Sequence, residues 1–274
     1  MRTESAVVRR PCVSGYYYPA DPGALRQQIA ELTHSQDSLV PARAVVVPHG
    51  SYRHAGRIIG ATLSRIAIPR RCIILGPSHT GSWMPWSVMA SGVYRTPLGD
   101  VPIDSRCADA LRARCAFLEV DAWTQRGEHA IEVVLPFLQQ LGPPELAIVP
   151  IILGSERPDE RLRLAEALAQ VVRMQEEPVL LVASSDLSHY EPEAQGAARD
   201  RSLIESIRTL DSTALLREID TRATKMCGAG AVACVLDAAR ALGAACAVPV
   251  AYGTSVAGGG DPGSAIGYAG LIIQ

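Results

Sequence analysis

The sequence lacks the patterns that mark secreted, membrane-spanning and disulfide-stapled proteins. Its first residues, MRTESAVVRRPCV, contain no apolar core of signal-peptide length, and no later segment reaches about 18 consecutive apolar residues. The seven cysteines are odd in number and include no C-x-x-C pair. We therefore expect a cytoplasmic protein in which most cysteines are reduced, small core residues.

An excess of charge of one sign is also absent. The 26 basic residues are offset by 28 acidic ones, which gives a formal net charge of -2. This balance is not typical of proteins that bind nucleic acid or an anionic membrane, so we expect a small molecule or a protein as the partner. The 274 residues are enough to bury a full core.

Strand-like and helix-like segments alternate along the chain. The predicted strands are 44–49, 72–76, 87–91, 145–153, 178–183 and two closing strands, 248–254 and 265–273, which a Gly-rich loop at 257–263 connects. The predicted helices lie near 55–66, 130–141, 158–173, 196–208 and 229–242. Several strands are apolar on both faces, which indicates a sheet covered by helices on both sides. The predicted fold is an α/β sandwich, a single domain over 1–274 with a largely parallel or mixed central sheet.

Histidines follow several of the predicted strands directly. The first strand ends VVVPHG at His49, the next ends ILGPSH at His79, and LLVASSDLSH leads to Asp186 and His189. The carboxyl ends of parallel strands meet at one edge of a sheet, where ligands bind. We therefore predict one shared site at this edge. His34 and His54 follow no predicted strand, and we expect them to be surface or structural residues.

Two further segments are candidates for the same site. Glu128 and His129 are predicted at the start of an amphipathic helix, where Glu128 also suits the helix dipole and needs no catalytic role. Cys227 precedes an Ala-rich helix, and the helix N-terminus with Lys225 nearby favours thiolate over thiol. Imidazole and thiolate suit transition metals, and a three-ligand set leaves positions open for substrate or water.

The residues themselves leave two kinds of chemistry open. A remaining histidine can move protons beside such a metal, and an aspartate can fix its tautomer. The competing use is a Cys-His nucleophile pair that needs no metal. Spacing does not separate the two, because the candidates are far apart in the sequence and no compact H-E-x-x-H motif exists.

Eight blocks along nearly the whole chain resemble one known family. They are SGYYYPADPGALRQQI, ARAVVVPHGSYRHAG, ILGPSHT, VYRTPL, EHAIEVVLPFLQ, SSDLSHY, MCG and SAIGYAGLII, in this order. On these blocks the sequence is identified as a member of the Memo family, called AmmeMemoRadiSam system protein B in prokaryotes. The family is similar in fold to the class III extradiol dioxygenases, which hold Fe(II) with two histidines and a carboxylate. In Memo proteins a cysteine replaces the carboxylate.

The resemblance implies a role for each candidate residue. The implied metal ligands are His49, His79 and Cys227. The implied catalytic pocket residues are His189 as acid/base, Asp186 and His129. The expected ion is Fe(II) or copper, with zinc as a further candidate, and the expected chemistry is redox or oxygen chemistry on an unknown small molecule.

Two alternatives to this enzyme remain open at the level of sequence. One is a non-catalytic metal- or partner-binding protein that acts with AMMECR1-like and radical-SAM proteins, which the resemblance implies as partners. The other is a hydrolase with Cys227 as nucleophile and His189 as base. The chain also departs from the family pattern at Gly50, Ser51, Thr80 and Ala229 to Ala231. We therefore expect the wall of the pocket that contacts substrate to differ from that of relatives.

Overall fold

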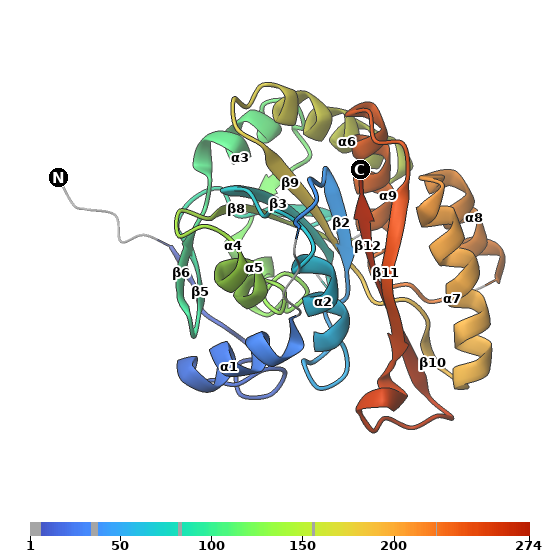
Figure 1. Ribbon diagram of the computed structural model, residues 1–274. Coiled ribbons are helices and arrows are strands. Elements are labelled where there is room, and N and C mark those ends of the chain that lie inside the picture. Colours follow the sequence, from blue (N-terminus) through green and yellow to red (C-terminus); the bar gives the residue numbers. More distant parts are fainter. Residues whose placement is uncertain (1–6, 34–37, 82–83, 155–156, 223) are drawn as a thin grey trace.

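A mixed β-sheet forms the centre of the molecule, with helices on both of its faces (Figure 1). The structure is a computed structural model that describes residues 7–33, 38–81, 84–154, 157–222 and 224–274. His34 lies outside the described residues. Within these ranges we find no helix with the length and apolarity that a bilayer crossing requires.

The four strands at the middle of the main sheet are parallel to one another. They are β2 (Ala44–Val47), β9 (Val179–Ser184), β3 (Arg71–Pro77) and β8 (Ala147–Leu153), in this spatial order. Antiparallel strands extend the sheet on both sides. On one side lie β12 (Ala265–Ile273), β11 (Ala247–Thr254) and β10 (His189–Glu191), and on the other β4 (Trp86–Val88), with β7 (Glu119–Val120) parallel to β4. The predicted α/β class with a mixed sheet is therefore confirmed.

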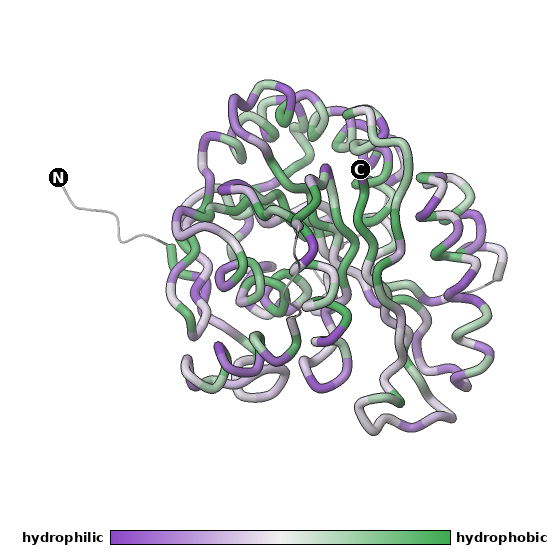
Figure 2. The backbone as a smooth tube through the Cα atoms, in the orientation of Figure 1, coloured by the Kyte–Doolittle hydropathy of each residue, from purple (hydrophilic) through white to green (hydrophobic). Residues whose placement is uncertain are grey.

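The helices bury both faces of this sheet. One face is covered by α1 (Pro22–Leu32), α2 (Gly56–Leu63) and α5 (Leu135–Leu141). The other is covered by α3 (Ser105–Arg112), α6 (Pro158–Arg173), α7 (Glu193–Arg208), α8 (Ser212–Arg222) and α9 (Ala229–Ala241). Neighbouring residues of one strand belong to opposite cores, as Val45 and Val46 show. Figure 2 shows the resulting concentration of hydrophobic residues along the central strands.

A small second sheet lies beside the main one. It consists of β1 (Val8–Arg9), β5 (Val93–Thr96) and β6 (Gly99–Pro102), and the short helix α4 (Ala122–Arg126) packs near β1 and β4. These strands have two to four residues each, too few for a hydrophobic period to reveal them in the sequence.

One predicted helix begins later than expected, and the difference affects the site. Helix α5 begins at Leu135 instead of near residue 130, with Pro136 in its first turn. Proline has no N–H to donate and is tolerated in the first turn of a helix but not in its interior. Residues 130–134 therefore form turns, and Glu128 and His129 lie in the irregular segment before them, not at a helix start as predicted. By contrast, α6 coincides with the predicted helix at 158–173.

Candidate metal centre

A cavity of about 830 Å³ opens at the carboxyl edge of the parallel strands. The strands β2, β9 and β3 are adjacent and parallel, so their carboxyl ends lie together. The loops that follow them therefore contribute side chains to the lining of this cavity. The structure brings all six residues predicted for the site into the lining of this one cavity: His49, His79, His129, Asp186, His189 and Cys227.

His49 is the most deeply buried of these histidines, with 1% of its surface exposed. Its Nδ1 lies 2.8 Å from the Ser184 hydroxyl, and that hydroxyl donates its only proton to the carbonyl of Ala130 at 2.6 Å. The hydroxyl oxygen can therefore only accept from Nδ1–H, which leaves the Nε2 lone pair of His49 free for another partner. Burial lowers the pKa of His49 to about 4, so the ring is neutral at pH 7.

His79 is held by Glu128, a carboxylate with no exposed surface. Its Nδ1 donates to Glu128 Oε1 at 2.9 Å, its backbone N–H donates to Oε2, and the N–H of Ala130 donates to Oε1 at 2.8 Å. Burial alone raises the pKa of Glu128, but the hydrogen bonds and the charge of His79 outweigh it and lower this pKa to about 2. Glu128 is therefore an anion that keeps a proton on His79 Nδ1. Burial alone lowers the pKa of His79, but the hydrogen bond to Glu128 and its charge outweigh burial and raise this pKa. Glu128 does not engage His79 Nε2, which is left for another partner.

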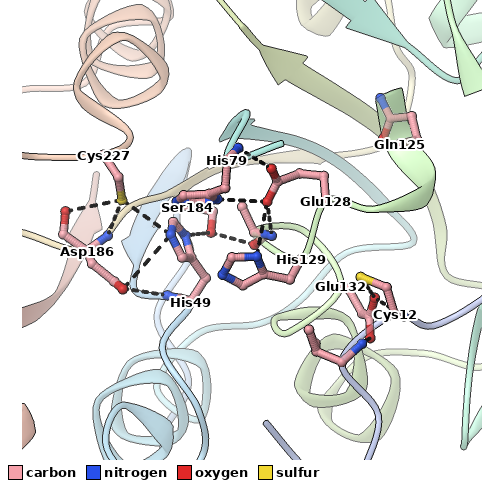
Figure 3. A network of polar contacts seen from close by, with 12 residues as sticks. Cys12, His49, His79, Gln125, Glu128, His129, Glu132, Ser184, Asp186 and Cys227 are labelled. Carbon is pink, nitrogen blue, oxygen red and sulfur yellow. Dashed lines mark hydrogen bonds and ion pairs between the residues drawn. The ribbon is translucent and has the colours of Figure 1, made fainter. Parts of the chain in front are cut away.

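His129 completes a group of three imidazoles (Figure 3). Its ring centroid lies 5.5 Å from that of His49 and 4.6 Å from that of His79, and the His49 and His79 centroids are 5.1 Å apart. One ligand nitrogen from each ring lies within 4.8 Å of those of the other two. Burial lowers the pKa of His129, which keeps this ring neutral as well.

Cys227 lies on the other side of His49 and is not a member of the three-histidine group. Its Sγ is 3.3 Å from His49 Nε2 and accepts the backbone N–H of Asp186 at 3.3 Å. The expected thiolate is wrong for the metal-free side chain, because burial and then the charge of Asp186 raise the pKa of Cys227 far above its usual value. Asp186 also accepts the backbone N–H of His49 at 2.8 Å.

His189, like His49 and His79, has its Nδ1 engaged by a hydrogen-bond partner and its Nε2 available. Its Nδ1 lies 2.7 Å from the carbonyl of Leu187 and 3.0 Å from that of Lys225. Carbonyl oxygens only accept, so Nδ1 carries the proton and Nε2 has a free lone pair. This arrangement suits a residue that takes up a proton from a bound molecule.

The sequence reasoning gave Ser184 no role, named Glu128 only as a residue that suits a helix dipole, and expected His54 on the surface or in a structural role. Ser184 and Glu128 engage Nδ1 of His49 and His79, whereas His54 lines the cavity, contacts Ser51 at 3.0 Å and lies outside the three-histidine group. No local pattern signals the roles of Ser184 and Glu128, because each depends on a partner from another part of the chain. At Gly50, one of the departures from the family pattern, a Cβ would lie 2.8 Å from the Tyr268 ring, so an alanine there would require this ring to shift.

Fold and site together define an α/β protein with a histidine-rich pocket at the carboxyl edge of its sheet. A family model described as Memo-like protein matches residues 9–272. A MEMO1 family protein of Methanopyrus kandleri is 33% identical over 97% of this chain and 99% of its own length, and one of Methanococcoides burtonii is 32% identical over 97% and 100%. The chain therefore belongs to the Memo family.

A solved structure also shares this fold. It is that of the uncharacterized protein JW3007 from Escherichia coli K12, with a TM-score of 0.58, 15% sequence identity, and coverage of 84% of this chain and 99% of that chain. At this identity the similarity concerns the fold alone. The predicted relation to the class III extradiol dioxygenases stays a prediction.

Proposed function

We propose that this protein is a mononuclear non-haem metalloprotein whose ion is held by His49, His79 and Cys227. The observation that carries this proposal is the arrangement of the two imidazoles: Ser184 and Glu128 engage both Nδ1 atoms, so the two Nε2 atoms remain for an ion. A metal-binding histidine typically donates its other ring N–H to a carboxylate or another fixed acceptor, as both of these do.

The donor set fits a transition metal. A metal–nitrogen bond of about 2.0–2.1 Å and a metal–sulfur bond of about 2.3 Å place the two donors about 3.3 Å apart when the angle between the bonds is about 100°. The separation of His49 Nε2 and Cys227 Sγ is 3.3 Å. Two imidazoles and a thiol that loses its proton on binding suit iron, copper or zinc, of which we propose Fe(II) or copper.

The chain's own residues supply the remaining parts of a reaction site. A bound iron or copper ion supplies Lewis-acid or redox chemistry when present. Asp186 holds the backbone of His49, and His189 has a free Nε2 that can take up or return a proton. The cavity of about 830 Å³ is within the usual range of about 300–1,000 Å³ for small-molecule sites. We therefore propose redox or oxygen chemistry on a small molecule, with His189 as acid/base.

Elemental analysis of protein purified without oxygen tests this proposal. We expect close to one equivalent of iron or copper in the wild type and in His189→Ala, and loss of the metal in His49→Ala. His54→Ala is the matched control, because this histidine lines the same cavity outside the three-histidine group. If the wild type holds no ion even after reconstitution with Fe(II), Cu(I) and Zn(II), the proposal is wrong.

A metal-free thiol hydrolase has less support. The pKa of Cys227 is raised mainly by burial, so the nucleophilic thiolate is scarce at pH 7. The hydrolase prediction paired Cys227 with His189 as its base. The imidazole that contacts Cys227 is instead that of His49, and its low pKa of about 4 makes it a weak base. Activity that survives chelation and is lost in Cys227→Ala would favour the hydrolase instead.

A further inference from the structure

His129 faces the same space as the two proposed imidazole ligands. The sequence placed it in the pocket as a catalytic residue, without a part in metal binding. In the structure one of its ring nitrogens lies within 4.8 Å of a ligand nitrogen of both His49 and His79. Figure 3 shows His49 between Cys227 and Asp186 on one side and the other two imidazoles on the opposite side.

Glu128 connects His129 to His79. The carboxylate Oε1 that accepts from His79 Nδ1 at 2.9 Å also lies 3.4 Å from His129 Nδ1. One buried anion therefore faces the Nδ1 atoms of two imidazoles, and the second nitrogen of each ring remains for a ligand. The rings of Tyr17 and His129 pack in an edge-to-face arrangement, with their centroids 5.0 Å apart and an interplanar angle of 69°.

We propose that His129 is a further ligand of the same ion, so that three imidazoles hold it together with Cys227. This inference rests on the proposed function, because it needs an ion at His49 and His79. Imidazole donors of one tetrahedral ion lie about 3.3 Å apart, so rings now within 4.8 Å must approach one another. The side chains with room to move are His79 and His129, which are 32% and 18% exposed, whereas His49 is buried.

The charges around the three imidazoles suit a divalent cation. Glu128 lies behind His79 and His129, and an Asp186 oxygen is 4.0 Å from His49 Nε2. Two buried carboxylates beside the site attract a dication without occupying its ligand positions. Cys227, whose Sγ lies 3.3 Å from His49 Nε2, remains a ligand beside the three imidazoles.

X-ray absorption of the Zn²⁺-loaded, full-length protein tests the assignment directly. We expect three imidazoles around zinc in the wild type and two in His129→Ala. Zn²⁺ affinity, measured by competition with a chromophoric chelator, should fall more than about 100-fold in His129→Ala, beyond the loss that an outer-shell change causes. His129→Asn is a second variant of similar size in case His129→Ala does not fold, and His54→Ala is the matched histidine control.

Two results would overturn the assignment of His129 as a ligand. Only one of them would also overturn the proposed metal site. Two imidazoles in the wild type, with wild-type affinity in His129→Ala or His129→Asn, would show that His129 is not a ligand while the proposed metal site stands. No Zn²⁺ binding by the wild type would overturn both proposals. A sulfur neighbour at about 2.3 Å together with three imidazoles supports both proposals, whereas three imidazoles without sulfur support the assignment of His129 and overturn that of Cys227.

Discussion

Replacing Glu128 by glutamine is the most direct test of how the site is organised. The carboxylate accepts three hydrogen bonds, from His79 Nδ1, the His79 backbone N–H and the Ala130 N–H. A glutamine of the same size offers one acceptor oxygen, and its NH₂ group can only donate. At least one of the three donors then loses its partner, and the negative charge behind His79 disappears.

The expected loss follows from the hydrogen bond to the imidazole. A hydrogen bond to a charged group contributes about 1.5–3 kcal/mol, and about 1.4 kcal/mol corresponds to a tenfold change in an equilibrium constant. We therefore expect Glu128→Gln to weaken Zn²⁺ binding about 10- to 150-fold. The variant should also unfold at a lower temperature, because the same carboxylate connects two loops.

Chelator competition with Zn²⁺ measures the affinity, and circular dichroism with a melting curve checks the fold. Glu119→Gln in the exposed strand β7 is the matched control and should bind Zn²⁺ like the wild type. If a folded Glu128→Gln binds Zn²⁺ within twofold of the wild type, Glu128 does not orient a metal ligand.

Three further predictions concern the stability of the fold and the tautomer of His49. Burial raises the pKa of Glu132, but a buried guanidinium and hydrogen bonds outweigh it and lower this pKa. Its stabilisation is therefore complete above the unfolded pKa of about 4.3 and is lost as the pH falls through the folded value. Urea unfolding between pH 7 and 3 should show a steeper loss for the wild type than for Glu132→Gln, and parallel curves would contradict this. Gly60→Ala should lower the melting temperature although alanine favours helices by about 1 kcal/mol, because its Cβ would lie 2.1 Å from the Leu32 carbonyl. An equal or higher melting temperature would refute that clash. Ser184→Ala removes the acceptor of His49 Nδ1–H and should weaken Zn²⁺ binding about 10- to 100-fold, whereas unchanged affinity would show that this tautomer needs no support.

The main elements of the fold were predictable where the local signal is strong. Strands β3, β8 and β9 are apolar on both faces, and helix α6 begins at Pro158 with two acidic residues in its first turn. The start of α5 was predicted wrongly, because the apolar stripe continues through turns that precede Pro136. The antiparallel pairing at the sheet edges was not predictable in detail, since the residues of a strand do not specify which strand lies beside it.

The order of apolar strands and terminal histidines by itself determined that His49, His79 and His189 meet at one edge, because parallel strands end together. Only the tertiary structure decided how these residues are used. Glu128 reaches His79 across 49 positions of the chain, and Ser184 reaches His49 across 135. The tautomers of these two histidines, and the protonated state of the Cys227 thiol, depend on burial and on partners that are distant in sequence, and no local pattern encodes either of these.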